Sequence, residues 1–366
     1  MLQGRQEASD GGRARNATAL VLAGGKSLGA FEGGAYCALH DAGIRPSWVI
    51  GASIGAVNGA IIAGNPEEER TGALERFWSR AAVPSPIWAG ELGPWQEFAR
   101  RWTAQFQAMM LGSPAVFSPN PAAPAGFAWP APVGAMGMYD LTPLRRSLEE
   151  FVDFDRVNGG DLRLTVVAVD LETGEEVLFD TERHRLGPEH IMASGAMLVD
   201  FPPVEIGSRL FVDGGLRSNW PADVLCQEAR EDTTCFAIDL FSARGRRCNN
   251  IPEAFMRRHE LLMVATAFQI LKAHQHEEGL RDALKTVLKL VPENLRNRTE
   301  IKNALQLANR PAVDIRRVAW SSGDEIGLNT YDWSDRTLSL RWRAGELAAA
   351  DCLRELASSE ASVGSD

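Results

Sequence analysis

The sequence lacks a long apolar segment. No uninterrupted apolar run approaches the roughly 18 residues of a membrane span, and residues 1–18 lack the apolar stretch of a secretory signal. We therefore expect a cytoplasmic protein whose membrane contact, if it has any, is peripheral and transient.

Cysteine pairs and excess positive charge are also missing. The five cysteines are odd in number and scattered without C-x-x-C spacing, which predicts reduced thiols rather than a disulfide or zinc framework. No acidic loop has the EF-hand pattern, so we expect no metal and no other cofactor. A net charge of −10 argues against a nucleic-acid partner and would weaken adsorption to anionic lipid.

What the chain does contain is an alternation of strand and helix signals. Short apolar runs alternate with helical patterns over Thr18–Ala23, Gly29–Asp41, Trp48–Gly51 and Ile54–Ala63. Connections this short imply parallel strands in a layered α/β fold. Further expected elements are a strand pair over Leu162–Asp180, strands at Ser208–Gly215, Cys235–Phe241 and Val313–Trp320, and a helical region over Ile251–Ala308.

Residues 19–43, ALVLAGGKSLGAFEGGAYCALHDAG, place a Gly-rich turn between a strand and a helix. The turn does not fit a P-loop, because Leu20 stands where the first glycine is required, and Lys26 breaks the dinucleotide fingerprint G-x-G-x-x-G. Backbone amides of such a turn can instead stabilise an oxyanion. Gly24 and Gly25 would let the backbone approach a substrate closely.

A second motif is Gly51-Ala52-Ser53-Ile54-Gly55, or G-x-S-x-G, between a strand end and a helix start. This is the context of a nucleophile elbow, in which a sharp turn exposes the serine hydroxyl. A helix N-cap is the alternative role for Ser53. The context favours the nucleophile.

A serine nucleophile needs a proton acceptor, and the sequence offers two kinds. His184 and His190 flank a loop, whereas His259, His274 and His276 lie in charged helical sequence and are expected to be solvated. The other kind is Asp213, at a strand end before Gly214 and Gly215. Asp-Gly-Gly is also an ordinary turn, and Asp213 could act as a base only if held close to the serine in a poorly solvated site.

The segment Glu75–Tyr139 has a different character, since it holds five of the ten tryptophans together with several methionines and prolines. It could form a second small core under long loops or a cap lining an apolar channel for acyl chains. Both interpretations remain open from the sequence.

Together, GGKSLG, GASIG and DGG resemble the signature of the patatin-like phospholipase family, and MYDLTPLRRSLEEFVDFDRVN, GPEHIMASGAM and FVDGGLRSNWP resemble its bacterial branch. The resemblance implies a three-layer α/β/α sandwich with a mainly parallel central sheet. It implies hydrolysis of lipid acyl esters through a serine acyl-enzyme, with Ser53 as nucleophile and Asp213 as base. The oxyanion hole would comprise Gly24, Gly25 and Lys26, and the glycines that support the motifs would be Gly29, Gly51, Gly55, Gly214 and Gly215.

The chain departs from the family pattern at Lys26, where many members have a third glycine. If this residue needs a positive φ, lysine would be strained; we expect that it does not, so that lysine donates its N–H and adds a cation for an anionic head group. Asp200, in AMLVDFPP, likewise stands where an apolar or small residue is expected.

The expected organisation is a disordered tail at 1–17, a catalytic domain at 18–248, an extension packed on it at 249–350 and a flexible tail at 351–366. The extension resembles one found in a bacterial subgroup of the family. Two alternatives to the Ser53/Asp213 hydrolase are a Ser-His-Asp esterase using His184 or His190, and a catalytically impaired protein that binds an acyl chain. The expected partner is a lipid or other acyl ester.

Overall fold

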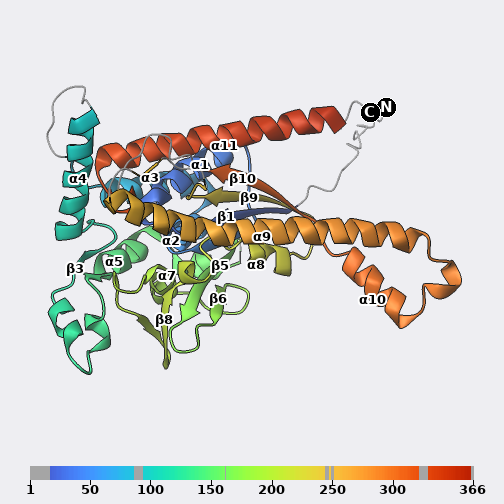
Figure 1. The fold of residues 1–366 in the computed structure, drawn as a ribbon, viewed down its shortest axis with the longest axis horizontal. Helices are drawn as coiled ribbons and strands as arrows, with labels where there is room; N and C mark the ends of the chain where they lie inside the picture. The colour runs from blue at the N-terminus through green and yellow to red at the C-terminus, as the bar shows by residue number, and fades with distance from the viewer. Residues whose placement is uncertain are drawn as a thin grey trace, which may run out of the picture.

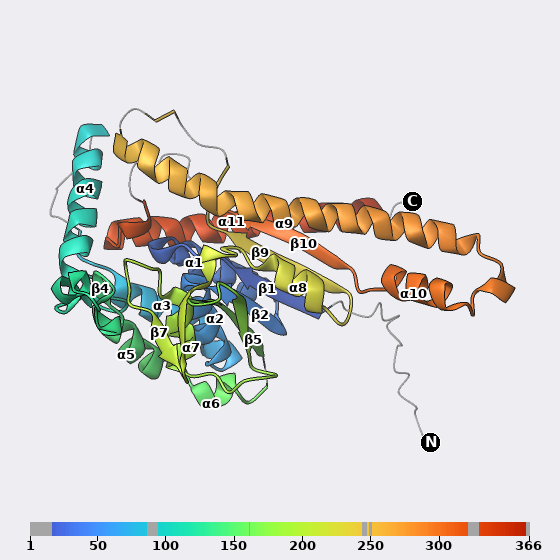
Figure 2. The same cartoon turned by 60° about the horizontal axis from the view of Figure 1, so that its bottom comes forward.

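The computed structural model describes residues 17–85, 94–160, 162–243, 247–248, 251–320 and 329–363. The tail expected at 1–17 lies outside these residues, apart from Ala17, which begins the first strand. Figures 1 and 2 show a sheet covered by helices, with one long helix projecting beyond it.

The strands of the main sheet are β1 (Ala17–Leu22), β2 (Trp48–Ala52), β5 (Arg163–Asp170), β6 (Glu176–Asp180), β7 (Val204–Ile206), β8 (Arg209–Asp213), β9 (Thr233–Asp239) and β10 (Val313–Ala319). A separate antiparallel pair is formed by β3 (Ser118–Pro119) and β4 (Tyr139–Asp140).

The helices are α1 (Gly29–Asp41), α2 (Ile54–Ala63), α3 (Arg70–Ala81), α4 (Pro94–Leu111), α5 (Thr142–Phe151), α6 (Phe154–Val157), α7 (Pro188–Gly195), α8 (Ala222–Glu228), α9 (Ile251–Lys289), α10 (Thr299–Ala308) and α11 (Asp335–Val363). Short 3-10 turns are η1 (Lys26–Leu28), η2 (Glu67–Glu69), η3 (Ala123–Phe127), η4 (Val133–Ala135), η5 (Gly214–Leu216), η6 (Glu293–Leu295) and η7 (Asn329–Tyr331).

The sheet order is β10-β9-β1-β2-β5-β8-β7, with β6 on the other edge of β5. The strands from β10 to β5 are mutually parallel, whereas β6, β7 and β8 run antiparallel to their neighbours. Helices α1, α2, α3, α7 and α11 contact one another on one face, and α8 and α9 pack together on the other (Figures 1 and 2). This confirms the mainly parallel three-layer α/β/α fold.

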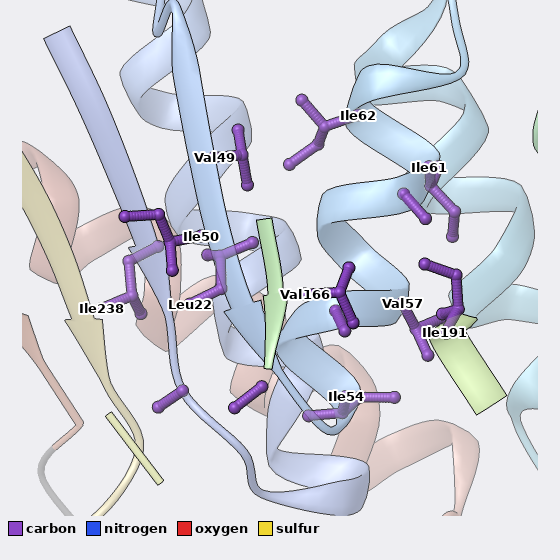
Figure 3. Close-up of a cluster of buried hydrophobic side chains, with 14 of the residues drawn as sticks. Leu22, Val49, Ile50, Ile54, Val57, Ile61, Ile62, Val166, Ile191 and Ile238 are labelled. Atoms are coloured by element: carbon purple, nitrogen blue, oxygen red, sulfur yellow. The ribbon is translucent and has the colours of Figure 1, made fainter. Parts of the chain in front are cut away.

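The core lies between the sheet and α2. Figure 3 shows strand side chains such as Leu22, Val49 and Val166 facing the side chains of α2, among them Val57 and Ile61. All of β2 is buried, as expected of a central parallel strand that helices cover on both faces. This dry, close-packed layer supports the turn at which β2 passes into α2.

The C-terminal part of the chain does not form a separate layer outside the fold. Strand β10 pairs with β9 along Val313–Ala319, and α11 packs lengthwise on α1. Residues 249–350 thus complete the sheet rather than only covering a finished domain. The prediction of a flexible tail at 351–366 is wrong for residues 351–363. Helix α11 continues to Val363, and Cys352 on this helix is buried.

Helix α9 extends far past the sheet. At about 1.5 Å per residue its 39 residues span about 58 Å, and α10 folds back against its far end as an arm (Figure 1). Among the described residues, no helix combines the length and the apolar character that a bilayer crossing requires.

The contact between α1 and α11 depends on glycine. A Cβ added at Gly345 would lie 2.0 Å from the backbone oxygen of Phe31, and one added at Gly34 would lie 2.0 Å from that of Trp342. We expect Gly345→Ala to lower the free energy of unfolding by about 1–3 kcal/mol, measured by urea denaturation, because the two helices must move apart.

Gly279 provides the matched control for this substitution. It lies within α9, and an added Cβ would meet no atom within 4 Å, so Gly279→Ala is expected to leave stability unchanged or slightly raised. Equal stability of Gly345→Ala and the wild type would contradict the close packing of α11 on α1.

Candidate active site

Ser53 lies in a tight turn between β2 and α2, with φ 54° and ψ −121°. Its flanking glycines are required by space: a Cβ at Gly51 would lie 2.5 Å from the Gly55 oxygen, and one at Gly55 would lie 2.4 Å from the Leu22 oxygen. A positive φ at a serine is strained, and it persists because this packing holds it. The turn therefore has the backbone of a nucleophile elbow.

Two hydrogen bonds to neighbouring elements fix this turn. The Ser53 N–H donates to Oγ of Ser194 on α7 at 2.9 Å, and the Ser194 hydroxyl donates to the Val167 carbonyl of β5 at 2.6 Å. Ser194 is fully buried. The Ser53 N–H is thereby occupied, and Ser194 was not among the site residues expected from the sequence.

The sheet topology brings Asp213 to Ser53. Strand β2 ends beside Val167 of β5, and β8, which runs in the opposite direction along the same edge of β5, ends with Asp213 beside Ala168. The carboxyl ends of β2 and β8 thus meet head to head. The Ser53 hydroxyl donates to Oδ2 of Asp213 at 2.7 Å, although the two residues are 160 positions apart.

Asp213 is only 1% exposed, and its other oxygen accepts a hydrogen bond from the Gly215 N–H at 2.7 Å. Gly214 has no room for a side chain, since a Cβ would lie 2.3 Å from the Val167 oxygen. Burial raises the pKa of Asp213 to about 6, despite the opposing effect of its bonds from Ser53 and Gly215. A carboxyl group with this pKa can accept a proton near neutral pH and release it again.

The Gly-rich loop borders the same site but differs in detail from the expectation. The Gly24 N–H, expected to be a donor of the oxyanion hole, donates to the Asn219 carbonyl at 2.9 Å and is therefore already engaged within the protein. Its missing side chain still matters, because a Cβ would lie 2.4 Å from Oδ1 of Asn219. Within the described residues, no hydrogen bond engages the N–H groups of Gly25 and Lys26.

Lys26 adopts φ 52°, so the expectation that this position avoids a positive φ is wrong. The ammonium group is not free for a head group either: it bonds Asp200 at 2.5 Å and the Tyr331 hydroxyl at 2.5 Å, and lies over the Tyr331 ring. Burial lowers the pKa of Lys26, and the charge of Asp200 opposes this. The two departures from the family pattern, Lys26 and Asp200, are therefore partners.

The C-terminal region also holds the Gly-rich loop from the other side. The Ser27 hydroxyl donates to the Thr330 carbonyl at 2.9 Å, and Arg341 of α11, fully buried, donates to Oγ of Ser27 at 2.7 Å. Together with the bond from Lys26 to Tyr331, these contacts hold the loop against residues that were expected to lie outside the catalytic domain.

A cavity of about 300 Å³ opens onto Ser53 and Asp213. Its wall combines Gly25 and Lys26, the segment around Asp200, and several residues of the C-terminal region, namely His259, Met263, Thr330 and Tyr331. None of its described lining residues comes from Glu75–Tyr139, so the cavity at Ser53 is not the acyl channel that was one of the two interpretations of that segment. Part of that segment, including Trp78 and Phe117, packs in the main core instead.

The histidines are distributed differently from the expectation. His190 accepts a hydrogen bond from the Gly187 N–H at 3.0 Å. The rings of His190 and His184 both pack edge-on against Phe179, and neither histidine lines the cavity. His259, expected to be solvated, does line it, and burial lowers its pKa. The helical spacing that puts His259 and Met263 on one face of α9 was the available signal. No cluster of metal-ligating side chains was found among the described residues.

Two models of known protein families match the chain. A family model described as patatin-like phospholipase matches residues 20–226, more than half of the chain, and one described as patatin phospholipase matches residues 266–362. No curated protein matches the chain.

Solved structures show weak similarity. VipD from Legionella pneumophila is 13% identical with a TM-score of 0.41, over 93% of this chain and 67% of that one. The type III effector ExoU is 14% identical with a TM-score of 0.28, over 80% and 62%. The ExoU–SpcU complex from the type III secretion system of Pseudomonas aeruginosa is 16% identical with a TM-score of 0.26, over 92% and 70%.

This chain thus spans about two thirds of the length of those solved chains. By the match over residues 20–226, it belongs to the patatin-like phospholipase family.

Proposed function

We propose that this protein hydrolyses carboxylic acyl esters of lipids, in the manner of a phospholipase A or lysophospholipase, through a Ser53/Asp213 dyad. The observation that carries the proposal is the 2.7 Å hydrogen bond from the strained, cavity-facing Ser53 to the buried Asp213. Membership of a phospholipase family supports a lipid substrate.

In the first half-reaction, Asp213 accepts the hydroxyl proton as Ser53 Oγ attacks the ester carbonyl carbon. The N–H groups of Gly25 and Lys26 stabilise the negative oxygen of the tetrahedral intermediate. When the intermediate collapses, the ester C–O bond breaks and Asp213 gives its proton to the departing alcohol. An acyl-Ser53 ester remains.

In the second half-reaction, Asp213 removes a proton from water, and the hydroxide formed attacks the acyl carbonyl. Collapse of this second intermediate releases the fatty acid and returns the proton to Ser53 Oγ. Since only ionised Asp213 can act as base, the acid limb of the pH profile of kcat/KM is expected near pH 6, the pKa of Asp213.

Active-site labelling tests the proposal directly. A serine-directed fluorophosphonate is expected to form one adduct, located at Ser53 by peptide mass spectrometry and absent in Ser53→Ala. Ser194→Ala, which keeps the hydroxyl of Ser53, should still be labelled, although more slowly because the turn is less well held. A folded wild type that is neither labelled nor active on p-nitrophenyl esters of any chain length would refute the hydrolase.

A second candidate, a catalytically impaired protein that binds an acyl chain, is favoured by one observation. Lys26 holds a strained left-handed backbone in the loop that would bind the oxyanion. Retained fatty-acid binding without labelling of Ser53 would select this candidate.

The histidines provide a further prediction. Because the base in reach of Ser53 is a carboxylate, His184→Ala and His190→Ala should retain kcat within about threefold, and His259→Ala should alter KM more than kcat because His259 lines the cavity. Steady-state kinetics on a soluble ester checks this. A loss of more than about 100-fold in kcat for any one of the three would instead indicate a Ser-His-Asp enzyme.

A further inference from the structure

The segment from Trp102 to Tyr139 contains no Asp, Glu, Lys, Arg or His. Charged residues make up 23% of the whole chain, so this segment differs strongly in composition from the rest of the protein. Soluble surfaces ordinarily carry mixed charge. The question is whether this segment is buried, which would explain the absence of charge.

Much of it is exposed. On α4, the side chains of Trp102, Phe106, Met109 and Met110 recur at i, i+4, i+7 and i+8, which places them on one helix face, and all four are solvent-exposed. The opposite face, with Ala104 and Ala108, is the buried one. The usual amphipathic order, with polar residues outward, is therefore absent from this half of the helix.

The loops that follow α4 extend the same character. Phe127 is 89% exposed and Trp129 98% exposed, and Met136 and Met138 are exposed beside them. In both views α4 and the β3–β4 loops lie at the same end of the molecule, opposite the projecting arm (Figures 1 and 2). We call these eight side chains, from Trp102 to Met138, the apolar end.

The apolar end borders the candidate active site. The Met138 N–H donates to the Val199 carbonyl at 2.9 Å, and the Tyr139 N–H donates to the Asp200 carbonyl at 2.8 Å. Asp200, with Met197 and Phe201 on either side, lines the cavity that contains Ser53. The parallel strands also run toward this end, since β10, which is parallel to β9 and β1, begins next to α10 on the arm side (Figures 1 and 2).

We propose that the apolar end docks on a neutral or zwitterionic lipid surface and brings the Ser53 cavity to its substrate; this rests on the proposed lipid hydrolase. Exposed Trp, Phe and Met side chains gain free energy when they leave water for the acyl boundary, and Trp suits the interface. The absence of Lys and Arg gives no attraction to anionic head groups, and the net charge of −10 opposes such lipids. A protein partner would typically meet a polar, charged rim around the apolar centre, which this segment does not supply.

Vesicle flotation tests the proposal with the full chain carrying Ser53→Ala, so that no lipid is consumed. Phosphatidylcholine vesicles are the probe, and phosphatidylglycerol vesicles are the comparison. We expect binding to phosphatidylcholine that persists in 0.5 M salt, and a reduction of about tenfold or more in the partition coefficient for Trp129→Glu with Phe127→Glu. Leu290→Glu, at an equally exposed apolar position on the far arm, should bind as before.

Each other outcome overturns the proposal. The proposed docking on a neutral or zwitterionic lipid surface would be wrong in any of three cases. These are the absence of flotation, equal binding by the double variant, and binding only to phosphatidylglycerol. A dimer that the double variant converts to monomer would show that a second copy covers the apolar end. The rate of hydrolysis of a soluble short-chain ester separates the two proposals. The double variant with Ser53 intact should hydrolyse this ester as fast as the wild type. If the wild type does not hydrolyse it either, the proposed hydrolase is wrong.

Discussion

Asp213→Asn is expected to lower kcat for a soluble acyl ester by about 10³–10⁴-fold. Asparagine can keep the geometry, accepting from the Gly215 N–H and donating toward Ser53 Oγ, but it cannot take the hydroxyl proton. Steady-state kinetics at pH 8 measures the loss. Retention of more than a tenth of wild-type kcat would exclude Asp213 as the base.

The same substitution is expected to stabilise the fold at pH 8. The folded-state pKa of Asp213, about 6, lies above its ordinary value of 3.8, so the folded state binds the proton more tightly and wild-type stability falls as pH rises from about 4 to about 6. A shift of about two pKa units corresponds to an upper bound of about 3 kcal/mol. A neutral asparagine escapes this cost, so urea denaturation should show a gain at pH 8 and little at pH 4.

Asp170→Asn is the matched control. Asp170 is also a buried strand-end carboxylate, but hydrogen bonds from the Thr173 backbone, together with Arg209, hold its pKa below the ordinary value. Its stabilising effect is present above the unfolded pKa and lost as pH falls, so Asp170→Asn should destabilise the fold at pH 8. The two variants thus move stability in opposite directions, and equal directions would contradict the electrostatic account of Asp213.

Lys26→Met is expected to reduce kcat/KM by about 10²-fold and to move its acid limb above pH 6. The substitution keeps a side chain at φ 52°, so backbone strain is unchanged, but it removes the bonds to Asp200 and Tyr331 that hold the loop carrying the Gly25 and Lys26 amides. Loss of well-placed oxyanion donors costs about 10²–10³-fold. The Lys26 charge also lowers the pKa of Asp213, so its removal lets that pKa rise.

Asp200→Asn should move the acid limb the other way. The Asp200 charge raises the pKa of Asp213, and its neutralisation lets that pKa fall. A pH profile of kcat/KM from pH 4 to 9 measures both shifts. Lys285→Met, on the exposed part of α9, is the control and should leave the profile in place. Shifts of the same sign in the two active-site variants would refute the coupling of this ion pair to Asp213.

Local sequence predicted the first half of the fold well. The helices expected at Gly29–Asp41 and Ile54–Ala63 are confirmed to the residue, and the strands at Trp48 and Thr18 to within one residue. These elements have unambiguous local signals: apolar runs for strands, glycines at the turns, and short connections that enforce parallel pairing. The contact of Ser53 with Asp213 was expected from their motifs, and its catalytic role stays a prediction.

The C-terminal half was less predictable. A strand at Val313–Trp320 and the helical region before it were expected, and β10 spans Val313–Ala319. Neither pattern says that β10 pairs with β9 or that α11 packs against the backbone of α1 at Gly345. The pairing of strands and the packing of helices depend on which surfaces of distant elements meet, not on the local propensity of either element.

The sequence by itself thus determined the α/β class, the strained serine turn and the aspartate at a strand end, because each is encoded in a few neighbouring residues. Only the tertiary structure decided which backbone amides are free beside Ser53, that Lys26 is held by Asp200 and Tyr331, and that His259 enters the cavity. The physical reason is range: hydrogen bonds and charges act over a few ångströms, and the residues that supply them here come from parts of the chain that only the folded sheet brings together.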